Sequence, residues 1–281
     1  MATKTTKLHN IVFRIRRYNP EVDSAPHYER YTVKVEPGMT VLDGLHQVRE
    51  QQDPTLSWRY SCRMGVCGSC GMLVNGKPML ACNNQILDIS GRELVIAPMP
   101  NFDIIKDLVP DLQPMFENHA SLRPFVHNEN EEELESPSGE YYQSPEELER
   151  YLQFSYCIRC GLCMSACPTL ATDVEYLGPM PLAQSYRWNA DTRDQGFDSR
   201  KSGAGDEHGA FRCHYAGECS NVCPKGVDPA RAIQFLKRQL VMDYFRLLRR
   251  REGCTVLGPD RDAQRRPEIP EAPPFTVEQG G

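Results

Sequence analysis

The chain has 281 residues, of which 40% are hydrophobic, and 32 Lys and Arg face 38 Asp and Glu, giving a formal net charge of -6. This length is enough for two domains, and the modest negative charge argues against a nucleic-acid partner, whose phosphates bind clustered positive charge. No apolar stretch is long enough to span a bilayer, so we expect a soluble or peripheral protein. Residues 1–10 lack the apolar core of a secretion signal, which favours a reducing compartment where thiols stay available for metal.

The N-terminal region predicts two strands followed by a helix. Apolar residues alternate with polar ones over 11–15 and again over 31–35, which is typical of two half-buried strands forming a hairpin. Thr40 with Asp43 three residues on resembles a capping box. The helix that follows turns Val41, Leu42, Leu45 and Val48 inward.

A cysteine loop comes after this helix. Its spacing, Cys62-x4-Cys67-x2-Cys70 with Cys82 further on, is that of a plant-type [2Fe-2S] cluster. The loop also contains small residues that let backbone amides turn toward sulfur: Gly65, Gly68, Ser69 and Gly71. For isolated CxxC pairs a tetrahedral zinc site is the alternative.

Two further strand signals follow the loop. Asn75-Gly76 between the short apolar arms of 72–80 predicts a tight hairpin, and residues 94–96 predict another strand. The first hundred residues therefore predict a small mixed sheet that grips one helix.

The middle of the chain reads as a connector. Residues 101–116 carry apolar side chains at irregular helical spacing, and residues 128–139 are acidic, which is typical of a solvated surface. Ser144-Pro145-Glu146-Glu147 then begins a helix with a cap, a first-turn proline and a carboxylate that reaches back. From there to about residue 250 we expect helices interrupted by cysteine loops.

Two cysteine runs lie in this helical part. The first, Cys157-x2-Cys160-x2-Cys163-x3-Cys167-Pro168, has the bacterial ferredoxin spacing, in which the fourth cysteine ligates the other of two clusters. The second has Cys213, Cys219 and Cys223-Pro224, but Ala216 stands where the same spacing calls for a cysteine. Crossing the fourth ligands assigns a [4Fe-4S] cluster to Cys157, Cys160, Cys163 and Cys223. The other site keeps only Cys167, Cys213 and Cys219, which predicts a [3Fe-4S] cluster.

The last helix is expected from about Asp228 to Arg251, with an apolar face among many Lys and Arg. Its basic end could bind anionic lipid or a membrane subunit; the alternative is that it is an ordinary solvent-exposed helix surface. Residues 253–281 lack periodicity and predict a disordered tail, in which Cys254 is an unligated thiol.

Three clusters of different type in one chain indicate an electron-transfer protein that carries single electrons from one cluster to the next. The sequence has no dinucleotide fingerprint, no phosphate-binding loop and no catalytic triad or carboxylate pair, so we expect no catalytic residue here and an organic cofactor on a partner subunit. Two alternatives stay open: a relay in another reductase, of the heterodisulfide or glycolate oxidase type, and a zinc-binding interaction module.

Residues 8–250 resemble the iron-sulfur subunit of the succinate dehydrogenase and fumarate reductase family. The resemblance rests on the segment 17–23 (RYNPEVD), the SCRM entry to the first cluster at 61–64, and CSNVCPK at 219–225. It implies [2Fe-2S], [4Fe-4S] and [3Fe-4S] clusters in order from flavin to quinone. It also implies a catalytic subunit with covalent FAD that interconverts succinate and fumarate, and one or two membrane anchor subunits that bind quinone. The chain is then expected at the cytoplasmic side of the bacterial cell membrane, as a peripheral protein.

The predicted fold class is α+β. We expect a β-grasp plant-type ferredoxin domain over 1–110, a helix and acidic linker over 111–143, and an all-α bacterial-ferredoxin-like domain over 144–252, before the tail over 253–281.

The resemblance also implies residues near the quinone, beside the [3Fe-4S] cluster: His214, Gln234 and Lys237. Thr172 stands where ubiquinone-type members have a tryptophan that bonds the quinone, and the N-terminal sequence is closer to fumarate reductases, which favours menaquinone. His214 has an alternative role, as a histidine that tunes the cluster without touching quinone.

Overall fold

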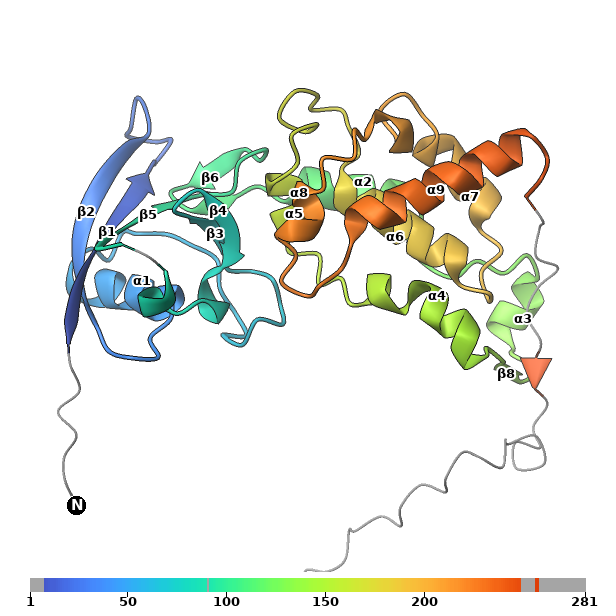
Figure 1. Ribbon diagram of the computed structural model, residues 1–281, viewed down its shortest axis with the longest axis horizontal. Coiled ribbons are helices and arrows are strands. Elements are labelled where there is room, and N and C mark those ends of the chain that lie inside the picture. The colour runs from blue at the N-terminus through green and yellow to red at the C-terminus, as the bar shows by residue number, and fades with distance from the viewer. Residues whose placement is uncertain (1–7, 90, 249–255, 258–281) are drawn as a thin grey trace, which may run out of the picture.

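A computed structural model describes residues 8–89, 91–248 and 256–257. A sheet formed by the first hundred residues stands beside a helical region formed by the second half of the chain (Figure 1). The molecule is therefore a mixed α/β protein with its strands and helices largely segregated along the sequence.

The N-terminal sheet has five strands in the order β2-β1-β5-β3-β4. β1 is antiparallel to β2 and parallel to β5, while β3 is antiparallel to both β5 and β4. The strands are β1 (His9–Arg17), β2 (His27–Val35), β3 (Gly71–Val74), β4 (Lys77–Leu80) and β5 (Glu93–Ala97). The predicted first hairpin, the Asn75-Gly76 hairpin and the strand over 94–96 are all confirmed.

Helix α1 (Val41–Gln51) lies against one face of this sheet (Figure 1). Its predicted capping box is confirmed, because the Thr40 hydroxyl accepts the Asp43 amide at 3.2 Å and the Asp43 carboxylate accepts the Thr40 amide at 2.8 Å. Gly44 allows the close approach of the helix, since a Cβ there would lie 2.5 Å from the Phe13 ring. Two short 3₁₀ turns, η1 (Ala81–Asn83) and η2 (Ile86–Asp88), follow β4.

Residues 101–110 are not helical, which corrects the helical spacing suggested for 101–116. They form the strand pair β6 (Ile104–Lys106) and β7 (Val109–Pro110), and helix α2 begins only at Gln113 and ends at Ser121. The reason is a buried charge at the turn. The Asp107 carboxylate, 1% exposed, accepts hydrogen bonds from the Arg17 guanidinium at 3.0 Å and from the Ser57 amide at 3.0 Å.

The acidic connector contains a short helix, α3 (Glu131–Glu135), and a two-residue strand, β8 (Glu140–Tyr141). β8 pairs antiparallel with β9 (Val256–Leu257). The predicted disorder of the tail is therefore wrong for these two residues, which form a strand. The rest of 253–281, including Cys254, lies outside the described residues.

Helices dominate the second half of the chain. Helix α4 begins with a capping box, since the Ser144 amide donates to the Glu147 carboxylate at 2.9 Å and the Glu147 amide donates to the Ser144 hydroxyl at 3.3 Å. The elements are α4 (Pro145–Ser155), α5 (Leu162–Ser165), α6 (Pro179–Ala190), α7 (Phe197–Ala204), η3 (Ala210–Arg212), α8 (Glu218–Asn221) and α9 (Pro229–Tyr244). Helix α9 packs along α6.

Helix α9 ends at Tyr244, earlier than the predicted end near residue 251. The chain leaves the helix at Arg246, whose φ of 57° is left-handed, and the Leu247 amide donates back to the Met242 carbonyl at 2.7 Å. This is a helix-terminating turn of the Schellman type, built here on a residue other than glycine. Residues 249–251 lie outside the described part of the chain.

The Arg200 side chain links the helical region to the segment around residues 123–125, which precedes it. Its guanidinium is fully buried, and its five N–H donors bind the Asp194 carboxylate at 2.6 and 2.7 Å, the Asn189 side chain, and the carbonyls of Arg123 and Phe125. A buried charge with every donor bonded and an ion-pair partner is tolerated in a protein interior.

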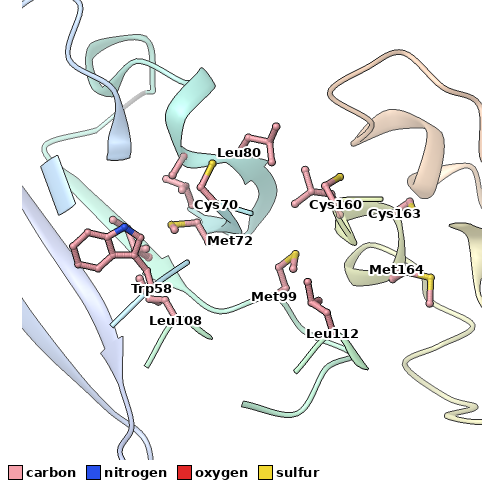
Figure 2. Close-up of a cluster of buried hydrophobic side chains, with 14 of the residues drawn as sticks. Trp58, Cys70, Met72, Leu80, Met99, Leu108, Leu112, Cys160, Cys163 and Met164 are labelled. Atoms are coloured by element: carbon pink, nitrogen blue, oxygen red, sulfur yellow. The ribbon is translucent and has the colours of Figure 1, made fainter. Parts of the chain in front are cut away.

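One hydrophobic core runs from the sheet into the helical region. Figure 2 shows its side chains continuing from Trp58 and Met72, past Cys70, Met99 and Leu112, to Cys160, Cys163 and Met164. Three of these residues are cysteines from two different cysteine runs. The core therefore brings the first and second predicted cluster sites next to each other. No helix in the described part of the chain is long and apolar enough to cross a membrane.

Candidate metal centres

The first cysteine loop turns its backbone amides toward sulfur. The Cys62 sulfur accepts three amides, from Met64 at 3.4 Å and from Val66 and Cys67 at 3.3 Å, and the Cys82 sulfur accepts the Gly65 amide at 3.2 Å. The Met64 amide foremost, with the Cys67 and Val66 amides, lowers the pKa of the Cys62 thiol to about 6. This loop is therefore built to stabilise sulfur that carries negative charge, as a metal-bound thiolate does.

Left-handed backbone makes this loop possible. Arg63, Gly65 and Gly68 have φ values of 60°, 69° and 76°. Cys70 and Cys82 lie on the buried side of the loop and Cys67 on its exposed side, so the donor set faces both the core and the surface. Burial raises the pKa of the Cys70 thiol to about 12, so without a metal this sulfur stays protonated.

The second site is an apolar cavity with four cysteines in its wall. Cys157, Cys160 and Cys163 from the first bacterial-type run meet Cys223 from the end of the second run. The remaining wall includes the apolar residues Ile158, Met180, Ala183 and Val227. Burial raises the pKa of the Cys160 thiol to about 12. Four sulfurs gathered around an apolar space, none of them in a disulfide with another described cysteine, fit a thiolate-ligated cluster.

The third site gathers three cysteines. Cys167, from the end of the first run, lies in the same cavity wall as Cys213 and Cys219, and Ala216 is part of that wall. The Tyr215 amide donates to the Cys213 sulfur at 3.4 Å, as the loop amides do in the first site. The structure thus brings together every cysteine that the crossed pairing groups, and it places an alanine methyl where a fourth sulfur would be.

The two bacterial-type runs are one structural motif used twice. In the first run Arg159 and Gly161, on either side of Cys160, have φ values of 54° and 83° and lead into α5. In the second run Tyr215 and Gly217, on either side of Ala216, have φ values of 60° and 81° and lead into α8. Ala216 is therefore the structural counterpart of Cys160, and the turn that would present a ligand is retained without the thiol.

The first two sites touch through Gly68. A Cβ on this residue would lie 2.7 Å from the Cys160 Cβ and 2.9 Å from its Cα, closer than real atoms come. Gly71 also approaches the second run, with a Cβ position 3.3 Å from the Leu162 side chain. The sites are in van der Waals contact through their own loops.

Comparison with known proteins agrees with this arrangement. Residues 12–117 match the family model of a 2Fe-2S iron-sulfur cluster binding domain, and residues 153–227 match that of a 4Fe-4S dicluster domain. The fumarate reductase iron-sulfur subunit of Mycobacterium tuberculosis is 45% identical over 230 residues, which cover 82% of this chain and 92% of the relative. That of Haemophilus influenzae is 42% identical, covering 82% and 93%.

The chain belongs to the family of fumarate reductase and succinate dehydrogenase iron-sulfur subunits. The mitochondrial succinate dehydrogenase [ubiquinone] iron-sulfur subunit of Candida glabrata is 36% identical, covering 86% of this chain and 96% of that protein. A chain of the Mycobacterium smegmatis Sdh1 complex in the apo form superposes with a TM-score of 0.75 at 26% identity, covering 85% of this chain and 98% of that one. The family membership supports the predicted sheet region followed by a helical cluster region.

Two of the three residues that the family resemblance places near quinone, Lys237 and His214, lie at the third site. The Lys237 ammonium donates to the Cys213 carbonyl at 2.8 Å. His214 is exposed and belongs to the wall of the third cavity. Gln234 lies one turn before Lys237 on α9, and its buried Nε2 has no hydrogen-bond partner among the described residues. Thr172 is exposed, and its hydroxyl donates to the Thr169 carbonyl at 3.0 Å.

A second kind of metal site is not supported. Ligand atoms of Asp173, Glu175 and His208 lie within 4.8 Å of one another. The Arg212 guanidinium already donates to the Asp173 carboxylate at 2.7 Å, so a cation occupies this position. The group is an ion-pair cluster at the surface.

Sequence reasoning missed one residue of the third site. Tyr176 is completely buried and belongs to the wall of the cavity formed with Cys167, Cys213 and Cys219. It lies nine positions after Cys167, outside every cysteine run, and no motif in the sequence links it to the clusters. Only the fold, which returns this segment to the cysteines, reveals its position.

Proposed function

We propose that this chain relays single electrons between a FAD-containing catalytic subunit and membrane quinone through three clusters. A [2Fe-2S] cluster is held by Cys62, Cys67, Cys70 and Cys82. A [4Fe-4S] cluster is held by Cys157, Cys160, Cys163 and Cys223, and a [3Fe-4S] cluster by Cys167, Cys213 and Cys219. The observation that carries this proposal is the pair of cavities, one walled by four cysteines and the other by three and Ala216.

The finer description of the fold is part of this proposal. The five-stranded sheet that grips α1 corresponds to a β-grasp plant-type ferredoxin domain over 1–110, and the helices with the two cysteine runs to an all-α bacterial-ferredoxin-like domain over 144–252. Residues 111–143 connect them. The order of the two family matches along the chain supports this division.

When bound, the clusters supply one-electron redox centres. The chain's own residues set where these centres lie and what surrounds them. Backbone amides at Met64, Val66 and Gly65 donate to thiolate sulfur in the first site and favour the more negative state. The wall of the second site is formed mostly by apolar side chains, and Gly68 lets the first loop approach Cys160.

We propose two separate surfaces for the two kinds of partner. The first cluster loop presents Met64 and Val66, 70% and 53% exposed, as a surface for the FAD-containing subunit. Beyond the third site, the end of α9 exposes Tyr244, Phe245 and Leu247 at 82%, 63% and 66%. Exposed apolar side chains of this size are typical of protein interfaces, and we assign this patch to one or two membrane anchor subunits. The chain is then peripheral, at the cytoplasmic side of the bacterial cell membrane.

His214, Gln234 and Lys237 are proposed to lie near the quinone. The support is that His214 lines the third cavity and that Lys237 binds the Cys213 carbonyl. Gln234 has a buried amide with no acceptor among the described residues, so it has a donor to offer. The menaquinone preference expected from the N-terminal sequence is part of this proposal.

The test uses the anaerobically purified complex. Metal and sulfide analysis should give about nine iron atoms per chain, and the oxidised protein should show the EPR signal of a [3Fe-4S] cluster. Zinc in place of iron, or the lack of sulfide, would support the zinc-module alternative and refute the relay.

A substitution tests the ligand sets. Ala216→Cys restores the missing sulfur in a turn that already has the conformation of its cysteine-containing counterpart, so the oxidised signal should change toward that of a [4Fe-4S] cluster and quinone reduction should slow. Ala204→Cys, in a buried position of α7 outside the walls of both cavities, is the matched control and should leave the signal as it is. An unchanged signal in Ala216→Cys would refute the assignment of Cys167, Cys213 and Cys219.

A further inference from the structure

The hydroxyl of Tyr176 is a buried donor directed at the third site. The side chain is fully buried, and its hydroxyl makes no well-aligned hydrogen bond with any described residue, although it lies within reach of the Cys213 thiol. Its electrostatic neighbours are the thiols of Cys213, Cys167 and Cys219, and it shares the cavity wall with all three.

An orphaned hydroxyl in such a place is costly unless a ligand bonds it. A buried polar group without a partner destabilises the fold, and buried tyrosine hydroxyls usually find one. The same cavity wall contains three cysteines, and a tyrosine keeps its proton up to about pH 10, so the hydroxyl is a donor. The acceptor that this geometry calls for is therefore a sulfur atom inside the cavity.

We propose that Tyr176 donates a hydrogen bond to sulfur of the cluster held by Cys167, Cys213 and Cys219, and thereby raises its reduction potential. The inference rests on the proposed function, since it assumes that cluster. Reduction adds one electron and makes the cluster more negative, so a donor to sulfur stabilises the reduced form more than the oxidised form. The O–H bond stays intact, and no proton is transferred.

Tyr176 is thus a positioning and tuning residue at the last centre before the acceptor. By contrast, the amides that donate to sulfur in the first site are part of the backbone, and no side-chain substitution removes them. Tyr176 is a place where a single side-chain change adjusts the potential of one centre.

The experiment is an EPR-monitored redox titration of the Tyr176→Phe complex. We expect the third cluster to be present in wild-type amount and its one-electron reduction equilibrium to fall about tenfold, which is about 59 mV toward lower potential. Tyr215→Phe removes a hydroxyl from a side chain of the same cavity wall that is 59% exposed, and should leave the potential unchanged.

A spectroscopic measurement separates hydrogen bonding from packing. In the wild type, electron-nuclear double resonance should detect a proton coupled to the third cluster that exchanges slowly with D₂O, and Tyr176→Phe should lose it. Retention of the coupling together with an unchanged potential would overturn the inference.

If Tyr176→Phe does not assemble the cluster, site-specific replacement of Tyr176 by 3-fluorotyrosine supplies the second test. This side chain keeps the shape and is a stronger donor, so the potential should rise; no rise would overturn the inference. A wild-type complex that shows no [3Fe-4S] signal would instead contradict the proposed function, and the two failures are therefore distinguishable.

Discussion

Replacing Gly68 by alanine should separate the two cluster sites that this residue brings into contact. The added Cβ would lie 2.7 Å from the Cys160 Cβ and 2.9 Å from the Cys160 Cα, so backbone has to move on one side or the other. Gly68 also has a φ of 76°, which an L-residue adopts at a cost of about 1–2 kcal/mol. The forced contact adds about 1–3 kcal/mol, as overpacking of a well-packed core does. The total loss of stability should be about 2–5 kcal/mol.

The matched control is Gly76→Ala. Gly76 has nearly the same φ, 77°, but an added Cβ there has nothing within 4 Å. It therefore carries the conformational cost of about 1–2 kcal/mol without the contact. The difference between the two variants isolates the packing of the first loop against the second cysteine run.

The assay is thermal unfolding of the purified complex at a fixed scan rate, together with its iron content. A change of 1 kcal/mol moves Tm by about 2–4 °C in chains of this size, so a difference of about 1–3 kcal/mol should make Gly68→Ala melt about 2–12 °C below Gly76→Ala. Gly68→Ala should also lose iron from the second site, because the displaced atoms belong to Cys160.

Equal melting temperatures and equal iron contents in the two variants would refute the reasoning that this contact fixes the spacing of the two sites.

Three other predictions follow from buried groups and a helix cap. Arg200→Met should lower the free energy of unfolding by about 3–5 kcal/mol, because it leaves the buried Asp194 carboxylate unpaired. The control Arg30→Met, at a surface ion pair with Glu93, should lower it by less than about 1 kcal/mol. Chemical denaturation measures both losses, and similar values would contradict the stated role of burial. Burial, and to a smaller extent the charge of Arg159, lowers the pKa of His119 to about 4. Above pH 6.5 the imidazole is neutral in both the folded and the unfolded chain. Between pH 6.5 and 4 only the unfolded chain takes up the proton. Stability should therefore fall by about 1–2 kcal/mol from pH 6.5 to 5, after allowance for screening by water, and His119→Leu should flatten the decline in Tm; parallel curves would exclude this cause. Thr40→Ala removes the helix cap and should lower the stability of the sheet region by about 1 kcal/mol, measured by the denaturation midpoint. Thr32→Ala, at an exposed strand position, is the control. An equal effect of the two substitutions would mean that the cap contributes nothing.

Local chemistry made much of the fold predictable from sequence. Capping boxes at Thr40 and Ser144 and the Asn75-Gly76 turn act within four residues, so short stretches of sequence contain the whole signal. The cysteine spacing works in the same way, because the ligands of a run are held by one local turn.

The misread elements depend on distant contacts. The strand pair β6–β7 turns at Asp107, whose carboxylate is bound by Arg17, 90 residues away, and no local pattern announces that contact. The early end of α9 depends on a left-handed Arg246, a conformation that its residue type does not favour. Tyr176 was missed for the same reason, since its importance comes from the later segment that folds over it.

The interleaving of the two bacterial-type cysteine runs has a consequence for how the protein is made. Each cavity takes sulfur from both runs, so neither is complete until segments more than forty residues apart have met. Filling one cavity therefore closes a long loop and brings together most of the other, which lowers the entropy cost of the second closure. Cluster delivery should then be all-or-none in this half of the chain. Cells short of iron would accumulate two populations, fully loaded and unloaded, with few half-loaded molecules between them.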